Sequence, residues 1–197
     1  MGLAIQGDIT NNDVQISKKF MDECQGTLVL HGTGSTVYID TPNAAHSIFC
    51  TVASQARIVV GKNCVFGNLA LHALEPGAVV MIGEDVGFNG QVSISAHERA
   101  TIEIGNECLF ASGVHVNASD VHSIFDLETH ERINPAQDIV IGRHVWIGAG
   151  AQILKGTRIG DMSVVGAGSI VSGAHPGNVI IAGVPARTVR QGIYWRR

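Results

Sequence analysis

Proton-transfer chemistry has its clearest candidates between residues 119 and 138 of this 197-residue sequence. His122 stands there with Asp120 and Asp126 on either side. An imidazole, whose ordinary pKa is about 6.5, can take a proton from a hydroxyl group at neutral pH, and a nearby carboxylate can orient its ring. His122 is therefore a candidate general base, and Asp120 and Asp126 are candidates to orient it or to bind an acceptor. The alternative is that all three are solvated side chains of a polar loop.

A second group of side chains is suited to phosphate. Four of the chain's basic residues are gathered at the C-terminus, namely Arg187, Arg190, Arg196 and Arg197. Guanidinium groups bind phosphate through paired hydrogen bonds. The C-terminus is therefore a candidate phosphate-binding region, although a charged tail that is merely solvated would explain Arg196 and Arg197 equally well.

A six-residue repeat supplies the elements that must position these groups. β-branched aliphatic residues recur at every sixth position from residue 141, and glycine follows most of them. The aliphatic residues are Ile141, Ile147, Ile153, Ile159, Val165 and Val171. A period of six fits neither a helix nor a simple alternating strand, but it fits a ribbon that turns a corner after each six-residue side. Three such sides make one coil.

The upstream half of the chain repeats this pattern more loosely. Three aliphatic–glycine pairs recur at a constant, longer spacing, at Val60-Gly61, Ile82-Gly83 and Ile104-Gly105. This spacing equals one coil of three six-residue sides plus a short bulge at a corner. Stacking then predicts an internal ladder of Phe66, Phe88, Phe110, Ile147 and Val165. A second ladder contains Cys64, Val86 and Cys108, so two of the cysteines are expected in the core.

The whole chain, 1–197, is expected to form a single all-β domain. Residues 27–40 alternate apolar and polar positions and predict an N-terminal β cap within 1–50, followed by coils over 51–118 and 139–185. The segment from Ile104 to Ile141 is about twice as long as one coil, which predicts an inserted loop over 119–138. Residues 186–197 are left as a C-terminal tail.

Composition excludes several classes of protein. A formal net charge of −4 leaves no basic face for nucleic acid, and no uncharged apolar run approaches the roughly 18 residues of a membrane span. Residues 1–20 lack the pattern of a signal peptide, so a cytoplasmic location is expected. The four cysteines are widely spaced along the chain and provide neither a zinc knuckle nor a redox pair, so no metal is expected.

Residues 141–190 resemble the hexapeptide-repeat acyltransferases, and within them the galactoside, maltose and nodulation-factor acetyltransferases and the capsular or polysialic acid O-acetyltransferases. The resemblance rests on the repeat itself, on the sequence AGVPAR from Ala182 to Arg187, and on the spacing between His122 and Trp146. It implies a left-handed parallel β-helix and a homotrimer with active sites between subunits. It also implies direct transfer of an acetyl group from acetyl-CoA to a hydroxyl of a sugar or surface polysaccharide, with His122 as the base.

The resemblance implies roles for other residues as well. Asn89 matches an acceptor-binding asparagine, and a turn asparagine is the alternative. Trp146 either lines the site beside His122 or packs against a neighbouring subunit. The positions that match coenzyme-binding residues are Ala149, Ala167, Ser172, Gly173, Arg187 and Arg190. Gly173 replaces a lysine, which leaves one phosphate contact of the family unmatched.

Two other functions remain open at this level. A γ-type carbonic anhydrase shares the solenoid and binds zinc through three histidines, for which His97, His115 and His122 are candidates. However, the spacing of His115 and His122 is longer than that family's usual one, and Trp146 would have no role. The second alternative is a hexapeptide scaffold without catalytic activity.

Overall fold

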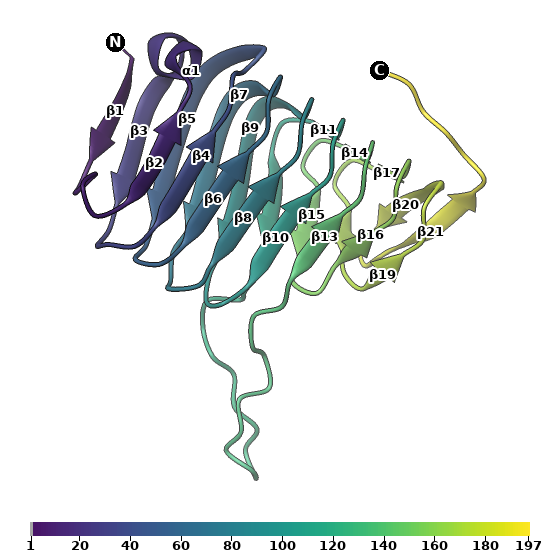
Figure 1. Cartoon of the computed structure of the whole chain (residues 1–197). Coiled ribbons are helices and arrows are strands. Elements are labelled where there is room, and N and C mark those ends of the chain that lie inside the picture. The colour runs from purple at the N-terminus through teal and green to yellow at the C-terminus, as the bar shows by residue number, and fades with distance from the viewer. Residues whose placement is uncertain (1) are drawn as a thin grey trace.

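The computed structural model describes residues 2–197 and shows a β solenoid of about eight turns (Figure 1). One eight-stranded sheet takes a strand from each coil: β2 (Asp13–Ile16), β4 (Thr36–Ile39), β6 (Arg57–Val60), β8 (Val79–Ile82), β10 (Thr101–Ile104), β13 (Ile139–Ile141), β16 (Arg158–Ile159) and β19 (Ala174–His175). All of its neighbouring strands are parallel.

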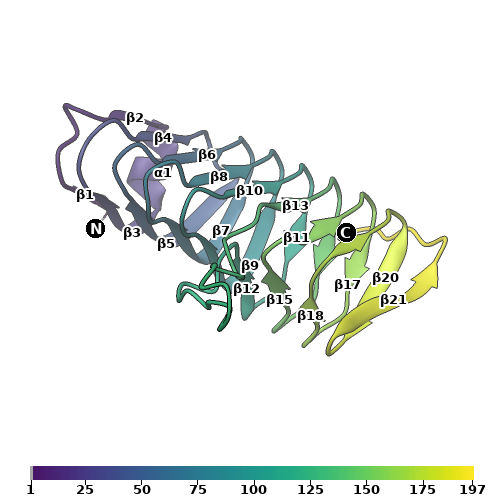
Figure 2. The ribbon, with the colours of Figure 1, turned by 90° about the horizontal axis from the view of Figure 1, so that it is seen from below.

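The second sheet has 13 strands and forms the other two sides of the solenoid. They are β1 (Leu3–Gln6), β3 (Gln25–Leu30), β5 (Ala44–Val52), β7 (Val65–Ala73), β9 (Gly87–Ala96), β11 (Leu109–Phe110), β12 (Val114–Asn117), β14 (Trp146–Ile147), β15 (Gln152–Leu154), β17 (Val164–Val165), β18 (Ile170–Val171), β20 (Val179–Gly183) and β21 (Ala186–Gln191). The long strand β9 serves both sides, because it pairs with β11 through residues 87–88 and with β12 through residues 92–95. In the later coils the sides separate into the β14 face (β11, β14, β17 and β20) and the β15 face (β12, β15 and β18), whose strands lie side by side in Figure 2.

The predicted internal ladder is confirmed. The register joins Phe66 to Phe88, Phe88 to Phe110, and Phe110 to Ile147. The ring centroids of Phe66 and Phe88 are 6.1 Å apart, and those of Phe88 and Phe110 are 5.1 Å apart. All three rings are fully buried, as are the thiols of Cys64 and Cys108. Because each coil lies one strand spacing from the next, equivalent side chains stack into a continuous core.

The glycine that follows most of the repeated aliphatic residues has a steric reason, which Gly105 illustrates. A Cβ atom there would lie 2.7 Å from the carbonyl carbon of Gly142 in the next coil. Such an approach is closer than a methyl group tolerates, and the obstacle is backbone, which cannot move aside. The glycine therefore lets consecutive corners stack in contact.

The N-terminal region differs from the expected β cap over 1–50; its first residue, Met1, lies outside the described residues. The strands β1 and β3, like β2 and β4, pair in parallel with the strands that follow and are coils of the solenoid itself. The end of the core is covered instead by the helix α1 (Lys18–Glu23), whose Phe20 ring lies 5.0 Å from that of Phe66. Alternation along residues 27–40 predicts strands, but it carries no information on how they pair.

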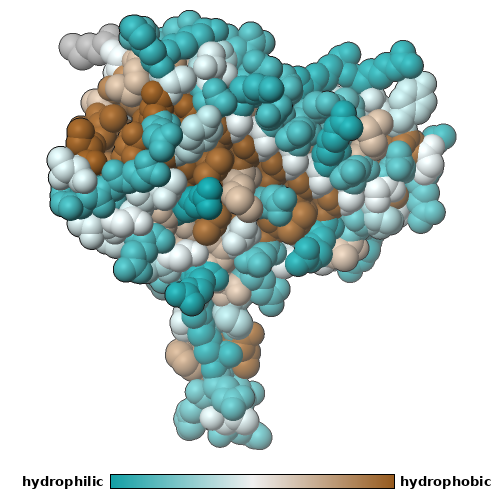
Figure 3. All heavy atoms as spheres, in the orientation of Figure 1, coloured by the Kyte–Doolittle hydropathy of each residue, from teal (hydrophilic) through white to brown (hydrophobic). Residues whose placement is uncertain are grey.

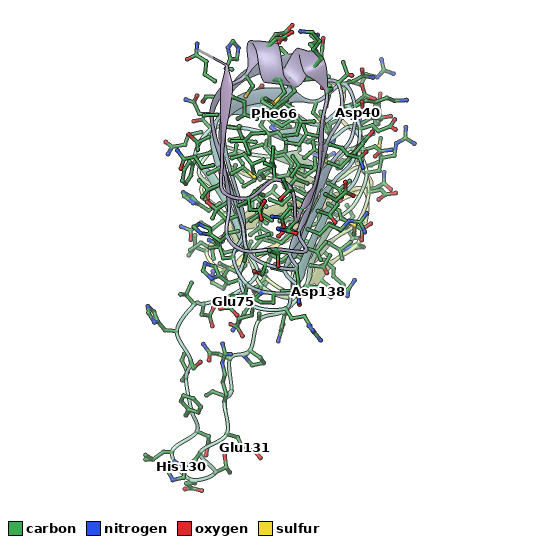
Figure 4. All side chains as sticks on the ribbon, turned by 60° about the vertical axis from the view of Figure 1, so that its left-hand side comes forward. Asp40, Phe66, Glu75, His130, Glu131 and Asp138 are labelled. Atoms are coloured by element: carbon green, nitrogen blue, oxygen red, sulfur yellow. The ribbon has the colours of Figure 1, made fainter. Side chains whose placement is uncertain are left out.

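Two segments of the C-terminal half do not follow the regular coil, namely the last strand and the inserted loop. After β20, strand β21 turns back and pairs with it antiparallel, which closes the stack. The inserted segment leaves after Ala118 and returns at Gln137, whose N–H donates to the carbonyl oxygen of Ala118 at 3.0 Å. It projects far from the solenoid, with Glu75 and Asp138 near its base and His130 and Glu131 at its tip (Figure 4). Within residues 2–197, no helix has the length and hydropathy that crossing a bilayer requires.

Candidate active site

His122 lies in the part of the projecting loop next to the solenoid, here called the stem (residues 119–122 and 132–137). Its imidazole is exposed. The buried side chain of Asn134, on the returning segment of the loop, binds the main chain at and after His122 and the side chain of Asp120 before it. Its Nδ2 donates to the carbonyl oxygen of His122 and to Oδ2 of Asp120, both at 2.9 Å. Its Oδ1 accepts the N–H of Ile124 at 2.6 Å. One amide side chain therefore fixes the direction in which His122 leaves the main chain.

The residue before His122 has a strained backbone. Val121 has φ of 67°, in the left-handed region that β-branched residues avoid. Its N–H donates to Oγ of Ser119 at 2.9 Å, so local hydrogen bonds hold the conformation in place. Strain of this kind costs on the order of 1–3 kcal/mol and persists where surrounding contacts impose it. The conformation of the main chain directly before His122 is therefore set by local hydrogen bonds.

The carboxylate of Asp120 points to Lys155 and Asn134. Lys155 follows β15 in the next coil, and its Nζ also donates to the carbonyl oxygen of Asn134 at 3.0 Å. The hydrogen bonds from Lys155 and Asn134 lower the pKa of Asp120 below its ordinary value. Asp120 thus ties the stem of the loop to the solenoid, and the hydrogen bonds of its carboxylate go to these two residues.

Asp126 lies farther along the loop. Its Oδ1 accepts the N–H groups of Glu128 and Thr129, at 3.0 and 2.8 Å, and the hydroxyl of Thr129 at 3.1 Å. These bonds lower its pKa and build a turn at the end of the loop. Its carboxylate is therefore used in shaping the turn.

Sequence reasoning missed the bidentate ion pair between Glu98 and Arg132 at the stem. The two guanidinium nitrogens Nη1 and Nη2 donate to the two carboxylate oxygens at 2.6 and 2.8 Å, and both side chains are mostly buried. Arg132 and the hydroxyl of Ser119 lower the pKa of Glu98 to about 2. Asn134 and Lys155 were missed too, because only the fold brings them to Asp120. Arg132 was visible as a loop charge, but its partner is 34 residues away.

Acid should destabilise the folded conformation of the loop, and the Glu98→Gln variant should show how much of this effect comes from the Glu98–Arg132 pair. The folded pKa of Glu98 lies below its ordinary value of 4.5, so its contribution is complete above about pH 4.5 and is lost as the pH falls toward about 2. Amide hydrogen exchange of residues 119–138, corrected for intrinsic rates, should therefore speed up between about pH 5 and about pH 2.5.

The Glu98→Gln variant should exchange faster already at the higher pH and change less with acid. Asp120 and Asp126 lose their charges in the same range, so some acid response should remain in that variant. Full protection of the wild-type loop at the acid end of this range would contradict the assignment.

The other predicted residues lie on several parts of the solenoid. Ala149 and Ala167 are exposed at one corner in successive coils, where the carbonyl of Ala149 accepts the N–H of Gly168 at 2.8 Å. Asn89 is exposed in β9, directly after the ladder residue Phe88. Ser172 and Gly173 follow β18, at the end of the β15 face. The structure thus aligns the two alanines but separates them from the Ser172–Gly173 pair.

Trp146 lies on the β14 face and lines a surface cavity of about 490 Å³, here called the Trp146 cavity. Trp146, Val164 and Ile180 come from the strands, and Arg190, Tyr194 and Trp195 come from the C-terminal residues. Arg187 lies on β21, outside the lining of the cavity, and its Nη1 donates to the carbonyl oxygen of Ala186 at 2.8 Å. The loop with His122 leaves from the end of the β15 face, at the opposite edge of the ribbon from the C-terminus (Figure 1). Within one chain, His122 and Trp146 therefore lie on different sides of the solenoid.

These features together define a hexapeptide-repeat transferase: a parallel β solenoid with six-residue sides, small exposed residues aligned at one corner, and a polar loop that carries a histidine. Residues 138–173 match the model of the family "Bacterial transferase hexapeptide (six repeats)". The polysialic acid O-acetyltransferase of Neisseria meningitidis is 31% identical over 64% of this chain and 68% of its own. The galactoside O-acetyltransferase of Escherichia coli (strain K12) is 29% identical over 90% of this chain and 87% of its own.

Among solved structures, the polysialic acid O-acetyltransferase OatWY is similar with a TM-score of 0.72 and 29% identity, over 99% of this chain and 91% of that one. A maltose O-acetyltransferase from Clostridium difficile 630 reaches a TM-score of 0.50 at 27% identity, over 68% and 66% of the chains. The chain belongs to the hexapeptide-repeat acetyltransferase family, as its repeat and AGVPAR sequence predicted.

Proposed function

We propose that this protein transfers an acetyl group from acetyl-CoA to a hydroxyl of a sugar or polysaccharide, with His122 as the general base. The observation that carries the proposal is the stem, where Asn134 and a strained Val121 present an exposed imidazole on a fixed backbone. The relatives named above are O-acetyltransferases of carbohydrates, which supports this class of reaction.

Direct transfer accounts for each proton and bond. His122 takes the proton of the acceptor hydroxyl as its oxygen attacks the thioester carbonyl carbon. The tetrahedral intermediate then expels the coenzyme A thiolate, which takes up a proton from the imidazolium, and the acetyl ester remains. No thiol of the protein is needed as a nucleophile. All four cysteines are buried, and burial raises their pKa values to about 11 or 12, so they are poor nucleophiles at neutral pH.

The corner with Ala149 and Ala167 fits the extended arm of acetyl-CoA. Both side chains are small and exposed, and a Cβ atom added at Gly168 would meet nothing within 4 Å. An extended chain can therefore approach the backbone there and form hydrogen bonds with it. Ser172, Gly173 and Arg187 remain the proposed contacts for the rest of the coenzyme, by resemblance to the family.

A homotrimer would complete the site. The projecting loop exposes apolar side chains that one chain leaves uncovered, namely Val121, Ile124, Phe125, Leu127 and Ile133, and Figure 3 shows apolar surface on it. Exposed apolar patches of this kind mark contact surfaces. In an assembly where a neighbouring copy receives the loop, His122 of one copy would lie against the face with Trp146 and the corner with Asn89 of the other copy.

Mass spectrometry in native conditions should then show three chains, and deletion of residues 123–133 should abolish the assembly.

The acceptor is best sought among both neutral and acidic sugars. The carboxylates of Asp120 and Glu98 are paired with Lys155 and Arg132, which weakens their repulsion of an anionic acceptor. The test is mass spectrometry of products from acetyl-CoA with maltose, methyl β-galactoside and an α2,8-linked sialic acid oligomer. A mass increase of one acetyl group on a sugar supports the proposal, and its absence for all three counts against it. We also propose a cytoplasmic location.

The alternatives have their own tests. No group of three His, Cys, Asp or Glu side chains suited to a metal ion occurs within a single copy of residues 2–197, and His97, His115 and His122 form none. Stoichiometric zinc in the purified protein would nevertheless favour a carbonic anhydrase. Failure to bind coenzyme A in calorimetry would favour a scaffold without activity.

A further inference from the structure

The C-terminal residues 192–197 contact the solenoid, chiefly through Trp195, although most of their side chains remain exposed. The ring of Trp195 stacks on that of His144 with centroids 4.2 Å apart and an interplanar angle of 28°. Nε1 of Trp195 donates to the carbonyl oxygen of His144 at 2.8 Å, and Nε2 of His144 lies 3.2 Å from the carbonyl oxygen of Trp195. Glu107 holds the other ring nitrogen of His144 at 3.2 Å. Arg197 donates to the carbonyl oxygen of Cys108 at 3.0 Å, a contact that neither interpretation of the C-terminal arginines included.

This docking gives the Trp146 cavity a second wall. Trp146 remains 41% exposed on one side, and Tyr194 is 69% exposed on the other. Arg190 contributes the charged group of the lining. An open aromatic cavity with a hydrogen-bonding group at its rim is typical of a site for a small amphipathic ligand.

We propose that the Trp146 cavity binds a sugar ring of the acceptor and that the C-terminal Tyr194 and Trp195 supply half of this site. A pyranose has apolar C–H faces that pack on aromatic rings, while its hydroxyl groups point to the rim, where Arg190 can donate to them or to a carboxylate. This use of Arg190 replaces the phosphate contact that the family resemblance implies. The inference rests on the proposed function, because the ring is taken to belong to the acceptor.

The ring geometry favours a sugar over the adenine of the coenzyme. The rings of Trp146 and Trp195 have centroids 6.0 Å apart and are inclined by 45°. A flat base held between two rings needs them parallel and roughly 7 Å apart, twice the contact distance of carbon atoms. His144 already covers one face of Trp195. A puckered ring can rest against inclined walls, whereas a flat base can stack face to face on only one of them.

Intrinsic fluorescence tests this site directly, since the chain has two tryptophans and both line the cavity. Maltose, methyl β-galactoside and an α2,8-linked sialic acid oligomer are titrated separately, and coenzyme A is titrated as the contrasting ligand. We expect a saturable change in emission with at least one sugar and a smaller change with coenzyme A. A response to coenzyme A alone, or to none of the three sugars, would overturn the proposal.

Kinetics of Trp195→Ala separate this proposal from the function it rests on. The variant should raise KM for the acetylated sugar roughly tenfold and leave KM for acetyl-CoA unchanged, while Trp195→Phe should keep KM for the sugar close to wild type. Tyr38→Ala, which removes a half-exposed aromatic side chain from β4, is the matched control and should behave as wild type. If the wild type acetylates a sugar and Trp195→Ala keeps the same sugar KM, the cavity assignment fails alone. If no sugar is acetylated although one binds, the proposed function fails instead.

Discussion

Replacement of His122 by alanine should lower kcat for acetyl transfer by about 10²–10⁴-fold, the usual contribution of a general base. The side chain is exposed, so its removal costs no core packing, and the melting temperature should stay near that of the wild type. Asn134 binds the carbonyl oxygen of residue 122, which alanine retains, so the stem should keep its conformation. Steady-state kinetics with the accepted sugar, together with calorimetry of coenzyme A binding, measure these effects.

The matched control for this variant is His130→Ala, at the tip of the same loop (Figure 4). It removes the same chemical group from an exposed position far from the stem and should leave kcat near the wild-type value. Near-normal transfer by His122→Ala, with coenzyme A binding and oligomeric state intact, would show that another group is the base. An equal loss in both variants would point to a general effect on the loop.

Phe88→Ala should have the largest effect on stability. Phe88 is fully buried between the rings of Phe66 and Phe110, so its removal leaves a cavity in the middle of the ladder that the regular coils cannot close. Substitutions of this kind cost about 3–5 kcal/mol, which for a chain of this size lowers the melting temperature by roughly 10 °C. Thermal and urea unfolding followed by circular dichroism measure the change.

Phe49→Ala makes the same chemical change on the surface, since the Phe49 ring is 52% exposed. It should cost no more than about 1 kcal/mol, because little packed area is lost. Equal losses from the two variants would contradict the assignment of Phe88 to the core, and the difference between them measures what the ladder contributes.

The sequence predicted the candidate base and its loop but not the residues that hold them in place. His122 and its loop could be recognised because residues 119–138 do not fit the repeat and therefore form an insertion, and because this insertion is polar. Asn134, Lys155 and the pair of Glu98 with Arg132 do not stand out, because each is an ordinary residue until the stem of the loop brings it to a partner 10 to 35 positions away. Asp120 and Asp126 were rightly noticed as loop carboxylates, but nothing in their spacing distinguishes a tether to Lys155 from a turn at the tip.

The repeat determined the coils, the ladder and the position of the insertion, because inward side chains and corner glycines must recur at every coil for neighbouring backbones to stack. The fold at the two ends was decided by tertiary contacts. Alternation at residues 27–40 predicts strands without specifying their partners, and Phe20 covers the core only because α1 packs on Phe66. The C-terminal residues read as a charged tail, yet the stacking of Trp195 on His144 joins positions 51 residues apart. Local patterns repeat along the chain and can be read from it, whereas contacts made once, between distant residues, exist only in the folded molecule.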